Sequence, residues 1–268
     1  MRIAIVGDVH GEFSTLRAVE NLGPDLIIQC GDLGFWPRWP TVGLELEAFT
    51  PQVPIRFCDG NHEDLETLFA HRVPGESPRA HEVKPGLFWQ DRGSTLTLPD
   101  GRVVLFVGGA WSFDDYRREP GVDWFPDMER VSEEDLSRLP DCKVDIVVSH
   151  TCPVRFRVGY ELPPVLREEQ RRKFNDGSMD HLDLVFEKYR PRLWVFGHWH
   201  WAMSGEHEGC KWIGLHRVDK CGGREVASRV HWLDGPVPEP AHPKRLDVPP
   251  DPLAVAMAEM LYGKREKE

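Results

Sequence analysis

The chain has 268 residues, with 33 Lys and Arg against 44 Asp and Glu, which gives a formal net charge of −11. Hydrophobic residues make up 40% and charged residues 29%, a composition that excludes a wholly disordered or fibrous chain. The net acidity argues against broad electrostatic capture of nucleic acid or an anionic membrane, since either needs a surplus of Lys and Arg on one surface.

Short apolar runs alternate along the chain with segments of helical spacing. The runs end at Gly, Asp, Ser or His, as buried strands do, and the predicted strands are 2–7, 25–31, 54–60, 102–109, 144–149 and 192–197. The helical spacing predicts helices at 13–22, 63–71, 132–139 and 178–189. Ser132 and Asp135 fit a capping box at the start of the third helix. Strand alternating with helix indicates an α/β layered fold.

Segments rich in Pro, Gly and charge separate these elements, and they predict loops at 72–86, 114–130 and 153–165. The composition changes past Asp234, because residues 234–253 contain seven prolines. We therefore expect a main domain over 1–233 and a Pro-rich C-terminal arm over 234–268, with a candidate short helix at 253–262.

The sequence shows no membrane or export signal. No apolar run approaches the roughly 20 residues that a membrane-spanning helix needs, and the opening MRIAIVGDVHGE turns polar too early for a signal peptide. Six thinly spread cysteines without a CxxC pair fit reduced thiols better than a disulfide framework. We expect a cytoplasmic protein with no membrane partner, whose oligomeric state the sequence leaves open.

Five of the twelve histidines stand directly after predicted strands, in company with Asp or Asn. The strand ends read Asp8-x-His10, Gly31-Asp32, Gly60-Asn61-His62-Glu63, Ser149-His150 and Gly197-His198-Trp199-His200. The carboxyl ends of strands in α/β sheets converge on one edge, where ligands bind. The spacing therefore predicts a single cluster, and the glycines allow the close backbone approach that it needs.

This cluster offers seven ligands: two carboxylates, four imidazoles and one amide oxygen. They are Asp8, His10, Asp32, Asn61, His150, His198 and His200. Seven ligands are too many for one tetrahedral ion, but they suit two ions that share a carboxylate such as Asp32. Two ions about 3.5–4 Å apart can activate a shared water for in-line attack at phosphorus. The imidazoles argue against Ca²⁺ or Mg²⁺ alone, and the lack of thiolate favours Mn²⁺, Fe or Zn²⁺.

Each motif alone is weak evidence, because an Asp-x-His or a Ser-His arises by accident in many chains. Gly-His-x-His is rarer, and the prediction depends on the ordered set of five strand ends. As a set, the motifs resemble the signature of the calcineurin-like metallophosphoesterase superfamily, in particular its small bacterial and phage members. The resemblance runs from Asp8 to His200.

The resemblance implies a four-layer α-β-β-α sandwich of two mixed sheets with a dinuclear site at the sheet ends. It implies one metal held by Asp8, His10, Asp32 and His200, and a second held by Asp32, Asn61, His150 and His198. The expected reaction is hydrolysis of phosphomonoesters or phosphodiesters through attack by a metal-bridged hydroxide. His62 is the expected catalytic residue, stabilising the transition state or protonating the leaving oxygen, and we expect Glu63 to orient it.

One block departs from the phosphoprotein-phosphatase and diadenosine-tetraphosphatase branches. There the second motif reads GD-x-x-D-R-G, with an acid that partners the catalytic His and an Arg for phosphate; here Gly31-Asp32 continues as Leu-Gly-Phe-Trp. The segment from Gly108 to Arg118, continuing to Trp124 and Glu129, resembles one in the small bacterial and phage members. We predict that Arg118, or Arg117 in its place, supplies the missing phosphate contact.

Two other functions stay open at this point. A non-catalytic binding scaffold keeps this fold in a retromer subunit of the superfamily, although no ligand is degraded here. A DNA nuclease is the other alternative, which the acidic balance disfavours, so we expect a small phosphoester as partner and not nucleic acid. The sequence does not choose between mono- and diester substrates.

Overall fold

The computed structural model describes residues 1–158, 176–219, 221 and 223–234. The proposed arm from residue 235 onward, with its candidate helix at 253–262, lies outside the described residues, as does 159–175. Within the described parts of the chain, no helix has both the length and the apolar character needed to cross a membrane.

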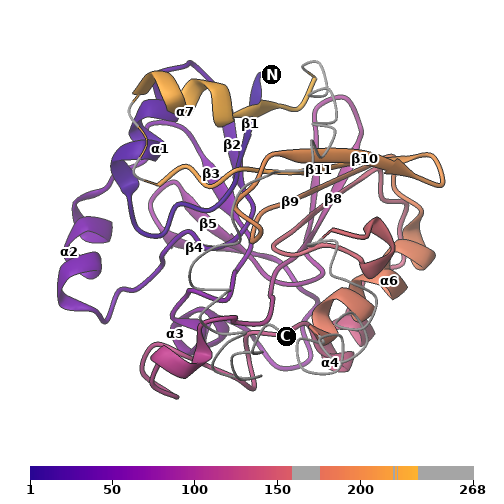
Figure 1. The fold of residues 1–268 in the computed structure, drawn as a ribbon, viewed down its shortest axis with the longest axis horizontal. Helices are drawn as coiled ribbons and strands as arrows, with labels where there is room; N and C mark the ends of the chain where they lie inside the picture. The colour runs from indigo at the N-terminus through magenta and orange to yellow at the C-terminus, as the bar shows by residue number, and fades with distance from the viewer. Residues whose placement is uncertain (159–175, 220, 222, 235–268) are drawn as a thin grey trace, which may run out of the picture.

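Two six-stranded sheets form the centre of the described structure (Figure 1). The first has the order β12 (His231–Trp232), β1 (Ile3–Val6), β2 (Leu26–Gln29), β3 (Ile55–Phe57), β5 (Leu87–Gln90) and β4 (Ala80–Lys84). Its four central strands are parallel, and the two edge strands pair antiparallel to them. The carboxyl ends of β1, β2 and β3 therefore lie at one edge, as the sequence predicts.

The second sheet repeats this plan. Its order is β10 (Met203–His207), β11 (Cys210–Gly214), β9 (Leu193–Phe196), β8 (Ile146–Ser149), β7 (Val103–Val107) and β6 (Thr95–Thr97). Again four parallel strands are flanked by antiparallel edge strands. Both sheets are thus mixed.

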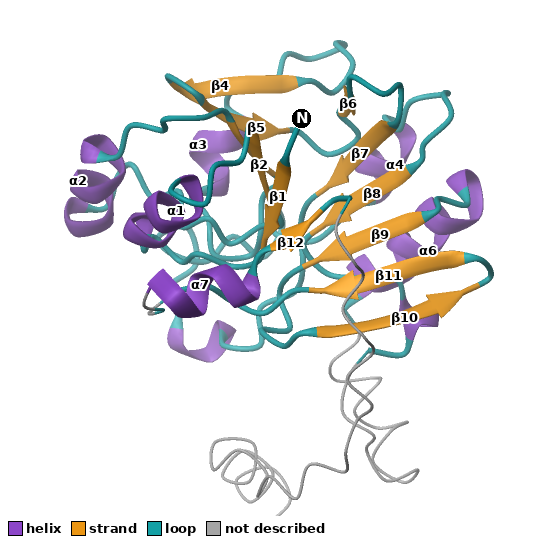
Figure 2. Cartoon of the chain, turned by 90° about the horizontal axis from the view of Figure 1, so that it is seen from above, coloured by secondary structure: helices purple, strands orange, loops and turns teal. Residues whose placement is uncertain are grey.

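Helices cover the outer face of each sheet (Figure 2). On the first sheet they are α1 (Phe13–Glu20), α2 (Pro40–Ala48), α3 (Leu65–Phe69) and α7 (Gly223–Arg229). On the second they are α4 (Glu133–Ser137) and α6 (Gly177–Tyr189). Two 3₁₀ turns, η1 (Asp115–Arg117) and η2 (Val154–Phe156), lie in connecting segments.

Three buried apolar clusters separate the four layers. Along β1, Ala4 and Val6 pack with α1 in the outer cluster, while Ile3 and Ile5 face the second sheet in the middle cluster. This alternation follows from the two-residue period of a strand. Val147 of β8 packs outward on α6, while Ile146 and Val148 face inward. The predicted four-layer sandwich is confirmed.

All six predicted strands and all four predicted helices are present; the strands and the first three helices are shorter than predicted by a few residues, whereas α6 begins one residue earlier and ends at Tyr189 as predicted. The capping box is confirmed, because the Ser132 and Asp135 side chains each accept a hydrogen bond from the other's backbone N–H. The prediction of a loop over 72–86 is wrong in part, since Ala80–Lys84 forms edge strand β4. This strand is half-exposed and has a bulge between Glu82 and Lys84, so it lacks the apolar run that marks a buried strand.

Candidate functional site

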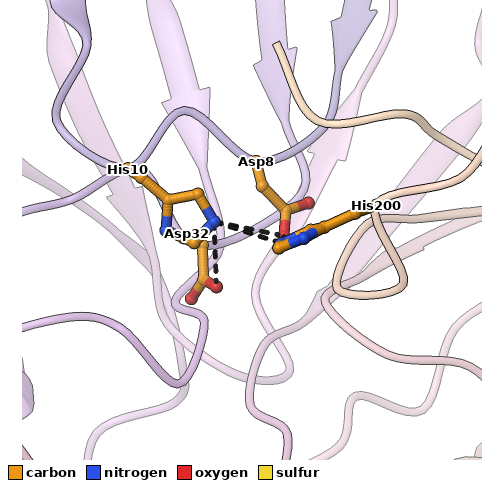
Figure 3. Close-up of side chains that lie close together, drawn as sticks. All are labelled: Asp8, His10, Asp32 and His200. Atoms are coloured by element: carbon orange, nitrogen blue, oxygen red, sulfur yellow. Dashed lines mark hydrogen bonds and ion pairs between the residues drawn. The ribbon is translucent and has the colours of Figure 1, made fainter. Parts of the chain in front are cut away.

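Four of the predicted ligands meet where the carboxyl ends of the two sheets come together. Asp8 and His10 follow β1, Asp32 follows β2, and His200 follows β9 of the other sheet (Figure 3). One donor atom from each lies within 4.8 Å of the other three, an arrangement able to hold a metal ion. Nε2 of His200 is 3.1 Å from Oδ2 of Asp8 and 3.2 Å from Nε2 of His10.

The other three predicted ligands lie on the far side of Asp32. Nε2 of His150 is 3.3 Å from Oδ1 of Asp32 and 3.0 Å from Oδ1 of Asn61. The ring centroids of His150 and His198 are 4.9 Å apart. Nδ1 of His150 is 2.8 Å from the carbonyl oxygen of Cys30, an arrangement in which Nδ1–H donates and Nε2 stays available as a ligand. The structure thus brings all seven residues together, with Asp32 between two groups.

An unpartnered nitrogen supports a cation at this second group. Nε2 of His198 is buried and has no hydrogen-bond partner among the described residues. Burial, and then the neighbouring His150, lower the pKa of His198 to about 3, so its imidazole is neutral. A neutral imidazole nitrogen that is buried without a donor is the form that binds metal ions. The donor set therefore fits a divalent metal.

Two buried carboxylates give the site a negative potential. Burial alone raises the pKa of Asp32, but His150 and then His62 outweigh it and hold the pKa well below its ordinary value. Burial lowers the pKa of His150, but the carboxylates of Asp32 and Asp8 outweigh it and raise the pKa to about 10. The rise at His150 reports the negative charge of these two carboxylates, which also favours a metal cation in place of the ring proton.

The backbone is strained where it presents these ligands. Four non-glycine ligands have left-handed φ angles: His10 (48°), Asp32 (53°), His198 (64°) and His200 (61°). Such angles are uncommon outside glycine and concentrate at functional sites. Gly60 permits the close packing here, because a Cβ on it would lie 2.0 Å from Oδ1 of Asp32.

Ser112 and Glu129 orient Asn61, a role that was not predicted for either residue. Nδ2 of Asn61 donates to Oγ of Ser112 at 3.1 Å, which turns Oδ1 of Asn61 toward His150. Oγ of Ser112 in turn donates to the buried Glu129 at 2.6 Å. Both residues come from the segment after β7, whose resemblance to small family members was noted, but which of its side chains reach Asn61 depends on how the segment packs.

His62 lies beside the first group. Its backbone N–H donates to Oδ1 of Asp32 at 2.8 Å, and its ring is 5.4 Å from that of His10, nearly perpendicular to it. Burial lowers the pKa of His62 more than the charge of Asp32 raises it. The expectation that Glu63 orients His62 is wrong. The Glu63 carboxylate is buried and accepts the backbone N–H groups of Leu33 and Phe35, so it supports the loop after Asp32 instead.

The predicted phosphate-binding arginines differ in their surroundings. Arg118 is 5% exposed and donates to the carbonyl oxygen of Asn61 at 2.9 Å, whereas Arg117 is exposed and packs over the ring of Tyr116. Two further residues beside the site were not predicted. Arg217, beyond β11, has Nη1 3.5 Å from Nδ1 of His200, and Phe113 stacks on the ring of His198 with centroids 5.2 Å apart.

Comparison with known proteins gave one family match and several distant structural likenesses. The model of the calcineurin-like phosphoesterase family matches residues 1–202. The chain is similar to phosphopantetheinyl hydrolase from Mycobacterium tuberculosis, with 14% identity over 89% of this chain and 98% of that one and a TM-score of 0.49.

A dimetal phosphatase from Danio rerio is 12% identical over 84% of this chain and 90% of that one, with a TM-score of 0.46. An archaeal phosphodiesterase is 14% identical over 81% of this chain and 84% of that one, with a TM-score of 0.37. The search of curated proteins found no match.

Proposed function

Because the chain belongs to the calcineurin-like phosphoesterase family, we propose that it hydrolyses phosphomonoesters or phosphodiesters with two divalent metal ions bound at the strand ends. The observation that carries the proposal is the convergence of Asp8, His10, Asp32 and His200 within 4.8 Å. His150, Asn61 and the unpartnered His198 on the other side of Asp32 support the second ion.

Each group of residues has its own part in this proposal. Asp8, His10, Asp32 and His200 would hold one ion, and Asp32, Asn61, His150 and His198 the other. When bound, the ions supply Lewis acidity and water made more acidic by coordination. Imidazole and carboxylate ligands without thiolate favour Mn²⁺, with Fe or Zn²⁺ as alternatives.

His62 is the proposed catalytic residue. Its backbone N–H donates to Asp32 and its ring lies against that of His10, so the ring stays close to two residues that would hold the ions. As the bond between phosphorus and the leaving oxygen breaks, the imidazolium form of His62 donates a ring N–H to that oxygen and transfers the proton to it, which leaves a neutral imidazole that water later reprotonates.

Metal removal tests the function. EDTA-stripped protein should lose hydrolysis of p-nitrophenyl phosphate and bis-p-nitrophenyl phosphate, and added Mn²⁺ should restore it, because coordination to a divalent ion is what makes water acidic enough to attack phosphorus near neutral pH. The Asp32→Ala variant should lower kcat/KM by at least about 100-fold and reduce bound Mn²⁺ measured by mass spectrometry, since both groups use Asp32.

Asp141→Ala is the matched control, because this exposed aspartate precedes β8 while His150 follows it. It should leave kcat/KM and metal content unchanged. Full activity after complete metal removal would contradict the proposal. Substoichiometric metal with no hydrolysis of either ester would instead favour a binding scaffold.

A further inference from the structure

Asp114, in the segment after β7, presents its carboxylate to His62. Oδ1 of Asp114 is 3.6 Å from Nε2 of His62, and this is the one ion pair that His62 makes within the described parts of the chain. The same oxygen is buried and accepts no hydrogen bond from any described residue, although the side chain as a whole is 43% exposed. A buried carboxylate oxygen normally has a donor, and its two charged neighbours among the described residues are Nε2 of His62 at 3.6 Å and Nη1 of Arg118 at 3.7 Å.

The segment that carries Asp114 is anchored to the backbone next to His62. Arg118 donates from Nη2 to the carbonyl oxygen of Asn61 at 2.9 Å and from Nη1 to Oγ of Ser112 at 2.5 Å. Nη1 also lies 3.7 Å from Oδ1 of Asp114. The position of the carboxylate relative to His62 is therefore set by short, charge-assisted contacts and not by the loop alone.

The two other acids next to His62 in the described structure are engaged elsewhere. Glu63 is occupied by two backbone N–H groups, and the carboxylate of Asp32 accepts the backbone N–H of His62. Among the described residues, no hydrogen bond occupies Nδ1 of His62. One ring nitrogen thus faces an acid, and the other is left for a ligand.

We propose that Asp114 is a positioning residue, which holds Nε2 of His62 so that Nδ1 is directed to the leaving oxygen of the substrate. The inference rests on the proposed hydrolysis and adds a residue to it. The loose 3.6 Å contact is expected to close when the ring carries a proton on Nε2. The proton given to the leaving oxygen comes from the ring of His62, and Asp114 only fixes where that ring points.

Comparison of two leaving groups tests the proposal in the Mn²⁺-loaded enzyme. The Asp114→Asn variant should lower kcat by about 10-fold on phenyl phosphate, whose leaving group needs protonation. Its kcat on p-nitrophenyl phosphate should stay within about 2-fold of the wild-type value, because p-nitrophenolate departs without a proton. If the enzyme prefers diesters, diphenyl phosphate replaces phenyl phosphate and bis-p-nitrophenyl phosphate replaces p-nitrophenyl phosphate in this comparison. KM should not change, since Asp114 does not touch the substrate.

Two further variants control the result. Asp115→Asn removes the neighbouring carboxylate of the same turn, for which the described residues show no side-chain hydrogen bond or ion pair, and it should match wild type on both esters. In the His62→Ala background, Asp114→Asn should not lower kcat further, because Asp114 acts through His62. Three results would each overturn the proposal. They are an equal reduction of kcat on both esters, an unchanged kcat on phenyl phosphate, and a further reduction of kcat by Asp114→Asn in the His62→Ala background.

A spectroscopic measurement separates this proposal from the proposed function. The nitrogen-15 shifts of the His62 ring at fixed pH report which nitrogen carries the proton. Asp114→Asn should change the tautomer population of His62, whereas Asp115→Asn should not, and an unchanged ring in Asp114→Asn would overturn the positioning role. If wild type with Mn²⁺ hydrolyses no ester, the proposed function fails and this measurement still decides the contact.

Discussion

Arg118 makes its contacts inside the protein. Its donors reach the carbonyl oxygens of Asn61 and Asp123 and the hydroxyl of Ser112, so the guanidinium joins the segment after β7 to a proposed metal ligand. A buried arginine with several acceptors is a structural anchor, and few of its N–H groups remain for phosphate. Arg117 is exposed and has more freedom to bind an anion.

These surroundings give the two arginines separable effects. Arg118→Ala should lower kcat/KM by about 10- to 100-fold and weaken Mn²⁺ binding, because Asn61 and Ser112 lose their anchor. Arg117→Ala should leave Mn²⁺ affinity unchanged and act through KM alone. Steady-state kinetics and a metal titration of both variants check this, and an Arg118→Ala protein with wild-type kcat/KM would remove Arg118 from the site.

Residues that follow a strand were predictable, whereas those on long loops were not. The residues proposed to bind metal stand within four positions of a strand end, where a parallel sheet leaves little choice of location. Ser112, Asp114 and Glu129 reach the site only because the segment after β7 folds back over it. Glu63 was misassigned for the same reason: its carboxylate points to the loop after Asp32, which sequence proximity to His62 does not reveal.

At the scale of elements, burial helped to make strands predictable but did not decide the outcome alone. The six predicted strands are almost wholly buried and rich in apolar residues, whereas β5 was missed although it is nearly as buried. Edge strands such as β4 and β10 are half-exposed and mix charged with apolar residues. Helix α2 was missed because Leu46 is its one buried residue, which leaves no apolar stripe to detect.

Helix α6 offers an internal comparison of buried and exposed leucines. Leu182 is 0% exposed and packs on the outer face of the second sheet, while Leu184, two residues later, is 57% exposed. Leu182→Ala should lower the free energy of unfolding by about 2–5 kcal/mol, because the cavity cannot fully collapse. Leu184→Ala should change it by no more than about 0.5 kcal/mol, and urea unfolding of both variants measures the difference. Equal effects would contradict the packing of α6 described above.

For the molecule as a whole, net charge and local charge must be kept apart. The formal charge of −11 bears on encounters with large polyanions, over distances comparable to the protein itself. The proposed site would hold two divalent ions among buried carboxylates, so a small phosphoester would meet positive charge there. The acidity of the chain therefore does not argue against a phosphoester substrate.

The proposed division into a body over 1–233 and an arm over 234–268 is tested by truncation. Leu233 packs in the cluster between the sheets, so a chain ending at Asp234 keeps every described element. It should unfold cooperatively, with a Tm within about 2 °C of the full chain, and keep its hydrolytic activity. Non-cooperative unfolding or a large drop in Tm would show that residues beyond 234 belong to the folded body.

The short strand β12 is synthesised late but completes the first sheet, so the sheet and the site depend on segments that leave the ribosome late. It pairs with β1, so the edge of the first sheet stays open until residues 231–232 have been made. The backbone N–H of His198 donates to the carboxylate of Asp8, so this contact forms only after the 190 residues that separate the two have been synthesised. Domains fold as units during synthesis, and a nascent chain lacking its last strands exposes an unpaired sheet edge. Metal binding is therefore expected only after nearly the whole body has been synthesised.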